Sequence, residues 1–269
     1  MKKSGQKVQT QVYIFATFMR LLFAYIRKND YLCTQNSKIG MKIKLFLGVL
    51  VISTMTVLQS SVYAQAQRDW AGFHVYAADN ARLDSLNTKV QVVFYGNSIT
   101  QIWNEIRPQF FTDNGFTGRG IGGQTSSELL VRMRQDVIDL HPHTVVIMCG
   151  VNDIAQNNGP ISLEHTIGNI ISMCELARAN HIRPILCSPL PARSFYWNPS
   201  ITNAPQQIQV LKELIENYAR KQNILYVDYY SAMVDKDGGL KKGLSEDEVH
   251  PNDTGYQIME PIILKALNK

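Results

Sequence analysis

The sequence predicts an α/β fold in which one parallel β-sheet is covered by helices on both faces. Five short apolar segments recur along the chain, and segments with helical periodicity separate them. Unbroken apolar runs of this length are typical of strands that are buried on both faces. Strands that alternate with helices form parallel sheets with right-handed crossovers. The five expected strands are residues 91–96, 116–121, 144–150, 183–190 and 223–230.

The expected helices precede, separate and follow these strands. An amphipathic helix is expected around residues 75–85, and a final helix is expected to begin after Pro251-Asn252-Asp253. Apolar residues spaced three or four apart predict three further helices, over residues 129–140, 163–174 and 208–218. Residues 191–205, with three prolines and three consecutive aromatic residues, form the longest expected loop.

The first 66 of the 269 residues differ in composition from the rest. Residues 41–66 combine a basic start, a short apolar run and an Ala64-Gln-Ala66 site, a combination typical of a secretory signal peptide. A membrane anchor is the alternative, but no basic stop-transfer segment follows the run. Residues 1–40 are interpreted as an extension from a wrongly chosen start codon, because Met41 stands where the signal peptide should begin.

Residues 67–269 are therefore expected to be one exported domain, periplasmic or extracellular, without a stable membrane span. The segment within residues 1–40 that competes as a membrane-embedded stretch contains Arg20 and is short of a span. No cysteine directly follows the apolar run of the signal peptide, so a lipid-modified N-terminus is not expected.

The basic balance of the whole chain resides in the leader. Residues 1–66 carry 9 Lys and Arg and 1 acidic residue, which leaves 18 basic and 21 acidic residues and a net charge of −3 in residues 67–269. A basic surface for nucleic acid is therefore not expected. Cys149, Cys174 and Cys187 lie in apolar segments, so we expect buried, unpaired thiols and no metal site.

Polar residues gather where the expected strands end. Gly96-Asn97-Ser98 ends the first strand, Gly122-Gly123-Gln124 follows the second, Asn152-Asp153 follows the third, and residues 247–250 precede the last helix. Ligands bind an open parallel sheet outside the carboxyl ends of its strands. These four segments are therefore expected to meet at one edge of the sheet.

Three of these residues have the chemistry of a nucleophilic relay. The hydroxyl of Ser98 needs a neighbouring base to accept its proton, and His250 is the candidate. The imidazole needs an acceptor for its Nδ1 proton, and Asp247, three residues earlier, can supply one. Each residue alone also has a structural interpretation, such as a helix cap or a surface position; the ordered set favours catalysis.

Together the four segments resemble the sequence blocks of the SGNH, or GDSL-like, hydrolases, named after Ser, Gly, Asn and His. The resemblance spans roughly residues 90–256 and is strongest to the branch of platelet-activating-factor acetylhydrolase subunits and bacterial acyl and carbohydrate esterases. It implies a flavodoxin-like three-layer αβα sandwich whose five-stranded parallel sheet has the order 2-1-3-4-5. It also implies a serine esterase with no metal or organic cofactor, acting on a small-molecule or glycan ester.

The resemblance further implies that the backbone N–H groups of Ser98 and Gly123 and the side-chain amide of Asn152 bind an oxyanion. Gly123 fits physically, because Thr125 and Glu128 form a capping-box pattern that predicts a helix N-terminus with free N–H groups just after the glycine pair.

The chain departs from the family pattern at two positions. Asn97 replaces the usual aspartate before the nucleophile, and Gln124 replaces the aspartate that commonly follows the glycine pair. Both side chains form hydrogen bonds but carry no charge. We therefore expect local electrostatics, substrate preference or rate to differ from the family pattern.

Several interpretations remain open from the sequence. Trp103 and the aromatic residues Phe195, Tyr196 and Trp197 either line the substrate pocket or pack within the protein. Asp235-Lys-Asp237-Gly-Gly is interpreted as a turn rather than as a calcium loop, because the later ligands are missing.

Function also has alternatives. A lysophospholipase, thioesterase or arylesterase would use the same residues, and a glycan-binding protein that has lost turnover would keep the fold. A G-x-S-x-G hydrolase is disfavoured because Thr100 occupies the second glycine position. A flavodoxin-type cofactor binder is disfavoured because the loop after the first strand is a poor phosphate cradle. The oligomeric state is not predicted.

Overall fold

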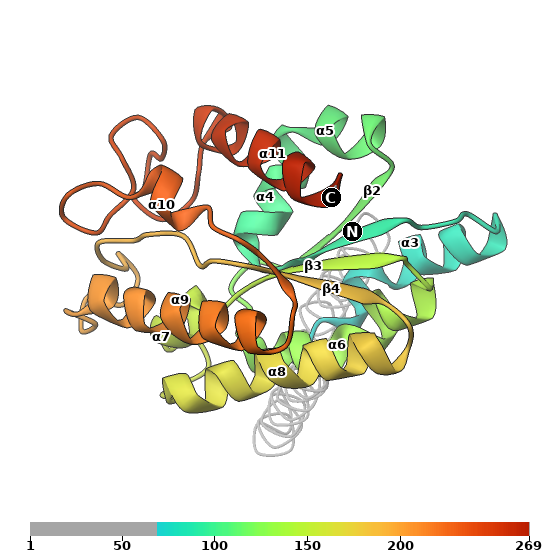
Figure 1. Cartoon of the computed structure of the whole chain (residues 1–269), viewed down its shortest axis with the longest axis horizontal. Helices are drawn as coiled ribbons and strands as arrows, with labels where there is room; N and C mark the ends of the chain where they lie inside the picture. The colour runs from blue at the N-terminus through green and yellow to red at the C-terminus, as the bar shows by residue number, and fades with distance from the viewer. Residues whose placement is uncertain (1–68, 269) are drawn as a thin grey trace, which may run out of the picture. The chain divides into compact units, whose positions relative to one another are not determined.

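Five parallel strands form the centre of the computed structural model, which describes residues 69–268 (Figure 1). The strand order is β2-β1-β3-β4-β5, and every neighbouring pair is parallel. The strands are β1 (Val92–Gly96), β2 (Phe116–Gly120), β3 (Thr144–Met148), β4 (Arg183–Cys187) and β5 (Leu225–Val227). The expected sheet and its order are thus confirmed. The predictions for residues 1–40 and 41–66 lie outside the described residues.

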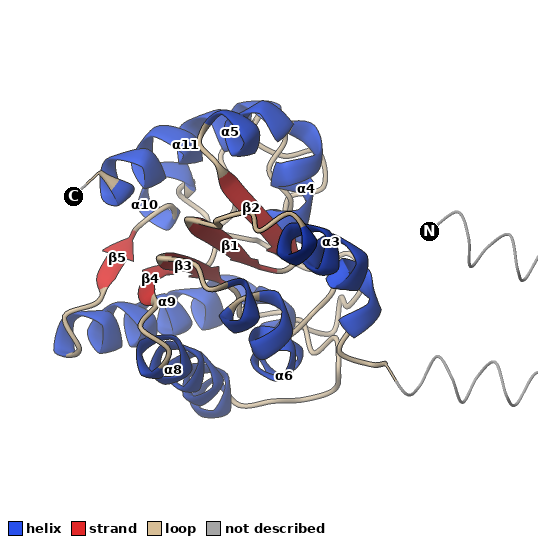
Figure 2. Ribbon diagram, turned by 90° about the vertical axis from the view of Figure 1, so that its right-hand side faces the viewer, coloured by secondary structure: helices blue, strands red, loops and turns tan. Residues whose placement is uncertain are grey.

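The helices form a layer on each side of the sheet (Figure 2). One layer contains α3 (Phe73–Ser85), α6 (Ser126–Asp136), α8 (Leu163–Ala179) and α9 (Ala204–Lys221). The other contains α4 (Ser98–Ile106), α5 (Pro108–Asp113), α10 (Tyr230–Met233) and α11 (Asp253–Leu267). A short helix, α7 (Val151–Ile154), follows β3, and a 3₁₀ turn, η2 (Ile138–Leu140), follows α6.

Side chains of each strand alternate between two apolar cores. In β1, Val93 and Tyr95 pack with the layer that contains α6 and α8, whereas Phe94 packs with the layer that contains α4 and α11. Because β1, β3 and β4 are buried on both faces, their sequences read as nearly continuous apolar runs, whereas the edge strand β2 contains Thr117 and Arg119. This burial explains why the strands were recognisable from composition alone.

The order of the strands places a crevice at the carboxyl ends of β1 and β3. From β1 the chain moves outward to β2 and then crosses back to β3, so the connections that leave β1 and β3 run to opposite sides. Open parallel sheets bind ligands at this kind of switch point. The loops after β1, β2 and β3 all open toward it.

Trp103 belongs to the core and not to a pocket. Its side chain is 1% exposed and stacks between Phe110, at a ring-centroid distance of 5.2 Å, and Tyr256, at 5.4 Å. The edge of Phe94 meets it as well, at 5.5 Å. The interpretation of Trp103 as a pocket residue is therefore wrong, because this face of α4 packs against α5 and α11.

The three described cysteines are free and buried, as expected. Burial raises the pKa of Cys174 and of Cys187 to about 12, so both stay protonated at neutral pH. Within residues 69–268, no helix combines the length and the apolar composition that crossing a membrane requires.

The close approach of β2 to the start of α4 generates a prediction about stability. A Cβ atom at Gly120 would lie 2.6 Å from the carbonyl oxygen of Asn97, and backbone atoms cannot move aside easily. We expect Gly120→Ala to lower the free energy of unfolding by about 1–3 kcal/mol through overpacking.

The matched control is Gly168→Ala in α8, where no atom beyond the adjacent residues and the local helix backbone lies within 4 Å of the added Cβ. It should raise stability by about 0.5–1 kcal/mol, because glycine is costly within a helix. Denaturant unfolding of both variants tests this difference, and equal effects would contradict it.

Candidate active site

Ser98 occupies the first position of α4, directly after β1. Asn97 caps this helix, because its side-chain oxygen accepts a hydrogen bond from the N–H of Ile99 at 3.3 Å. The N–H of Ser98 belongs to the first turn, where helical N–H groups have no partner within the helix. The nucleophile candidate therefore combines a hydroxyl at the pocket with a backbone N–H that has no acceptor within residues 69–268.

A chain of hydrogen bonds links Ser98 to His250 and Asp247. Ser98 Oγ lies 2.9 Å from His250 Nε2, and His250 Nδ1 lies 2.6 Å from Asp247 Oδ2. Because an ionised carboxylate only accepts, Nδ1 carries the proton that it donates to Asp247. Nε2 is then the acceptor for the Ser98 hydroxyl, which is the arrangement that general-base activation requires.

Asp247 is fixed by its own loop, residues 245–251, here called the relay loop. Its Oδ1 accepts hydrogen bonds from the N–H groups of Val249, at 3.0 Å, and His250, at 2.8 Å. Burial alone would raise the pKa of Asp247, but these bonds and the imidazole lower it to about 2. Glu248, the residue after Asp247, has a φ of +66°. An antiparallel bridge joins Ser245 to Pro251 at the two ends of the loop.

Gly122, Gly123 and Gln124, here called the glycine loop, are held from three sides. The N–H of Gly122 donates to Gln101 Oε1 at 2.7 Å. The carbonyl of Gly123 accepts from Asn157 Nδ2, and that of Gln124 accepts from Asn152 Nδ2, both at 2.9 Å. Within residues 69–268, the N–H of Gly123 has no acceptor.

The expected capping box at the start of α6 is confirmed. The N–H of Thr125 donates to Glu128 Oε2 at 2.8 Å, and the side chain of Thr125 accepts from the N–H of Glu128. Asp153, which follows β3, accepts from the N–H of Ser126 at 2.9 Å. The glycine loop therefore precedes a well-anchored helix N-terminus.

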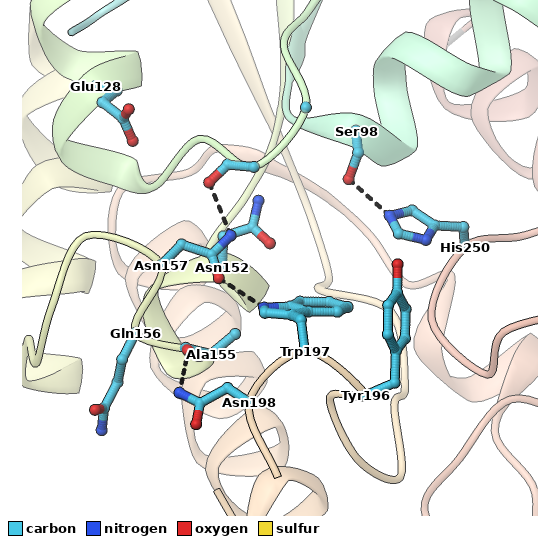
Figure 3. Close-up of a pocket in the computed structure, with 12 residues that line it drawn as sticks. Ser98, Glu128, Asn152, Ala155, Gln156, Asn157, Tyr196, Trp197, Asn198 and His250 are labelled. Carbon is cyan, nitrogen blue, oxygen red and sulfur yellow. Dashed lines mark hydrogen bonds between the residues drawn. The ribbon is translucent and has the colours of Figure 1, made fainter. Parts of the chain in front are cut away.

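A pocket of about 640 Å³ opens at this edge of the sheet (Figure 3). Its lining residues are Ser98, Gly122, Gly123, Glu128, Asn152, Ala155, Gln156, Asn157, Tyr196, Trp197, Asn198 and His250. Four of the five predicted site residues thus share one pocket. The fifth, Asp247, contacts His250 and is not part of the lining.

Two of the three consecutive aromatic residues line the pocket. Tyr196 and Trp197 are 68% and 37% exposed, and the indole ring lies nearly parallel to His250 at a centroid distance of 6.5 Å. Phe195 is fully buried in the core. The pocket interpretation therefore fails for Phe195, because the loop turns its side chain inward between β4 and α9.

The two departures from the family pattern lie outside the pocket lining. Asn97 caps α4, as described above. Gln124 is buried, donates to the carbonyl of Ala71 at 2.7 Å and accepts from Arg132 Nε at 2.6 Å. Both side chains thus make structural hydrogen bonds and do not line the pocket.

Gln101, Asn157 and Arg132 act on the site through hydrogen bonds that the sequence did not reveal. Each is a common polar residue without a motif, and each contacts a segment distant in sequence. Helical spacing offered a signal for Gln101, which lies three residues after Ser98 on α4. For Asn157 and Arg132 the sequence carries no comparable signal.

Asp235 forms a turn, as interpreted from the sequence. Its Oδ1 accepts from the N–H groups of Asp237, at 2.9 Å, and Gly239, at 3.0 Å, and its Oδ2 pairs with Arg193. Across residues 69–268, no three His, Cys, Asp or Glu side chains are grouped as metal ligands.

Comparison with known proteins shows the family of this chain. The chain belongs to the GDSL-like lipase/acylhydrolase family, whose sequence profile matches residues 94–258. It is similar to a Bacteroides fragilis protein assigned as an acylhydrolase, at 50% identity over 74% of this chain and 97% of that protein, with a TM-score of 0.72. The protein is therefore a hydrolytic enzyme, and the resemblance inferred from the four segments is confirmed.

More distant relatives add less. An acetyl-xylooligosaccharide esterase variant from Geobacillus, 20% identical over 66% of this chain and 94% of that one, shares the fold with a TM-score of 0.52. An uncharacterized lipoprotein of Bacillus subtilis is 27% identical over 147 residues, which are 54% of this chain and 51% of the lipoprotein. This chain thus spans about half the length of that relative.

The low pKa of Asp247 generates a prediction about pH. Its folded-state pKa of about 2 lies below the ordinary 3.8, so the ionised carboxylate stabilises the fold above pH 4. This contribution is lost as the pH falls through 2. We expect Asp247→Asn to lower the Tm at pH 7 and the deficit to shrink between pH 4 and pH 2.

Thermal unfolding of the wild type and the variant across this range checks the prediction. Asp84→Asn is the control, because the Asp84 carboxylate makes no hydrogen bond or ion pair within residues 69–268 and should give no such pH dependence. A deficit for Asp247→Asn that is constant with pH would contradict the assignment.

Proposed function

We propose that this enzyme hydrolyses short-chain carboxylic esters through an acyl-Ser98 intermediate. The observation that carries the proposal is the continuous path from Ser98 Oγ through His250 to Asp247 at the wall of an open pocket. Ser98 Oγ attacks the ester carbonyl carbon while His250 Nε2 takes its proton. His250 then returns that proton to the departing alcohol.

The second half of the reaction uses the same groups. Water attacks the carbonyl carbon of acyl-Ser98, and His250 accepts a proton from the water. The bond to Ser98 Oγ breaks, the carboxylic acid leaves, and Ser98 regains its proton from His250. Asp247 holds the imidazole in the required tautomer and stabilises the imidazolium that forms in each half.

In the proposed reaction, three donors bind the substrate oxygen as negative charge develops on it. These are the N–H of Ser98, the N–H of Gly123 and the second amide hydrogen of Asn152, whose first hydrogen is used by the Gln124 carbonyl. Such preorganised donors are worth about 3–4 kcal/mol each in comparable sites. The hydrogen bonds around the glycine loop support this role, because they fix the loop without using the Gly123 N–H.

The pocket lining favours a short acyl group on a sugar-like alcohol. Among the lining residues, Ala155 is the one aliphatic side chain, so a long acyl chain would meet amide groups such as those of Gln156 and Asn198. The exposed rings of Tyr196 and Trp197 offer flat surfaces suited to sugar rings. O-acetyl groups on a glycan are therefore the proposed substrate class.

The proposed site of action is outside the cytoplasm. It is supported by the signal-peptide pattern of residues 41–66 and the Ala64-Gln-Ala66 site. A polymer outside the cell that carries acetyl groups fits both the leader and the aromatic walls of the pocket.

Substitution of Ser98 tests the proposed mechanism. Ser98→Ala should reduce hydrolysis of p-nitrophenyl acetate by residues 67–269 at least 10⁴-fold, because residual catalysis would come from binding and the oxyanion donors alone. Ser85→Ala, an exposed serine at the end of α3, is the matched control.

Acetate release from an acetylated oligosaccharide and hydrolysis of p-nitrophenyl octanoate measure the acyl preference. We expect the wild type to favour the acetyl ester. Activity restricted to octanoate would instead support a lysophospholipase or thioesterase, and no activity with glycan binding that survives Ser98→Ala would support a binding protein.

Processing of the leader is a separate prediction. Expression of the full chain in a secreting bacterium should yield a mature protein whose N-terminus is Gln67, as measured by intact mass and N-terminal sequencing. Ala66→Arg should block cleavage, because the position before the cut requires a small residue. A wild-type product that retains residues 41–66 would contradict the export proposal.

A further inference from the structure

Asn157 lies between the aromatic wall of the pocket and the glycine loop. Its Oδ1 accepts a hydrogen bond from Trp197 Nε1 at 2.8 Å, and its Nδ2 donates to the carbonyl of Gly123 at 2.9 Å. Both bonds are visible in Figure 3, where the amide stands between the indole and the backbone of the glycine loop. One side chain thus joins the loop after β4 to the loop after β2.

Gly123 is the residue of the glycine loop whose backbone has a positive φ. Its φ is +78°, and without a side chain it has more backbone freedom than any other residue type. Its neighbours are held by Gln101 and by Asn152, whereas Asn157 supplies the hydrogen bond on Gly123 itself. The bond holds the peptide that follows Gly123, so its loss would let the backbone rotate about Gly123 and would relax the N–H of the preceding peptide, which the proposed reaction uses.

Trp197 is the other partner of Asn157 and also faces His250. Its ring is tilted 29° from the imidazole and lines the same pocket. A substrate that packs on this ring would therefore contact a side chain that is linked, through the amide of Asn157, to the carbonyl of Gly123. Two consecutive hydrogen bonds therefore join the aromatic wall of the pocket to the carbonyl of Gly123, the residue whose N–H is the proposed donor.

We propose that Asn157 is a positioning residue for the oxyanion donors and that the indole N–H of Trp197 acts on them through Asn157. This inference rests on the proposed esterase function. Asn157 aligns Gly123, and Trp197 fixes the rotamer of Asn157. The Asn157 amide and the indole N–H use their hydrogen bonds on each other and on Gly123, so the proposal gives them no direct part in the chemistry.

Four variants test the proposal in a double-mutant cycle. Asn157→Ala removes both bonds, Trp197→Phe removes the N–H and keeps an aromatic ring, and a third variant combines them. Asn158→Ala is the matched control, because the neighbouring Asn158 is exposed, lies outside the pocket lining and makes no side-chain hydrogen bond within residues 69–268.

The readouts are kcat and KM for p-nitrophenyl acetate, the rate at which a fluorophosphonate labels Ser98, and the Tm. Asn157→Ala should lower kcat and the labelling rate about tenfold with little change in KM, because a misaligned donor costs less than a missing one. The Tm should stay close to that of the wild type, since Asn157 is exposed.

Coupling is the decisive result of the cycle. Trp197→Phe should slow both reactions in the wild-type background and have no further effect when Asn157 is already Ala. Rates within twofold of the wild type for Asn157→Ala overturn the positioning role. Equal effects of Trp197→Phe in both backgrounds overturn the proposed path through Asn157.

A second measurement is independent of activity. The chain has three tryptophans, so a ¹⁵N spectrum shows three indole N–H signals, and Trp70 and Trp103 serve as internal references. Asn157→Ala should shift the Trp197 indole signal and the Gly123 amide signal and leave the other two indole signals in place. Unchanged Trp197 and Gly123 signals overturn the inference, even if the wild type hydrolyses neither ester and the proposed function itself fails.

Discussion

The buried guanidinium of Arg132 holds the segments of the site at fixed distances from one another. It extends from α6 and donates to the carbonyl of Gly96, at 2.9 Å, where β1 ends, and to that of Arg119, at 3.1 Å, in β2. It also donates to the side chain of Gln124 in the glycine loop, and its charge pairs with Asp136 at 2.9 Å. The turn that carries the proposed nucleophile and the loop with the proposed oxyanion donor are thus tied to one cation. A lysine would not replace it, because a point charge lacks the planar set of donors that reaches several acceptors at once.

This buried cation explains why the departure at Gln124 is tolerated. A fully buried charge is costly unless it is paired and its hydrogen bonds are satisfied. Asp136 supplies the counter-charge from the next turn of α6, and Tyr95 places its ring 4.5 Å from the guanidinium carbon. The residue in the glycine loop therefore needs to offer an acceptor and not a charge, which an amide oxygen provides. Gln124 thus replaces a carboxylate with an amide and keeps the hydrogen bond to Arg132 that spaces the site.

The sequence predicted what local composition determines and missed what tertiary contacts determine. Short segments rich in apolar residues located the five strands. The motifs after them located Ser98, Gly123 and Asn152, because the ends of parallel strands share one edge of the sheet. The role of Trp103 stayed open from the sequence, because an aromatic residue near Ser98 looks the same in sequence whichever face of its helix it occupies. Asn157 was missed because its two partners come from loops that only the fold brings together.

The relay loop carries both the proposed base, His250, and the carboxylate of Asp247 that is proposed to orient it. Asp247 accepts hydrogen bonds from the backbone and the ring of His250 within a segment whose ends are bridged, so the geometry between the two side chains is set inside the loop. A displacement of the whole loop would change the distance from Ser98 to His250 and keep the hydrogen bond that sets the tautomer of the ring. In the proposed mechanism, activation of Ser98 therefore depends on the distance between the relay loop and the first turn of α4, and a longer distance would leave the hydroxyl without its base.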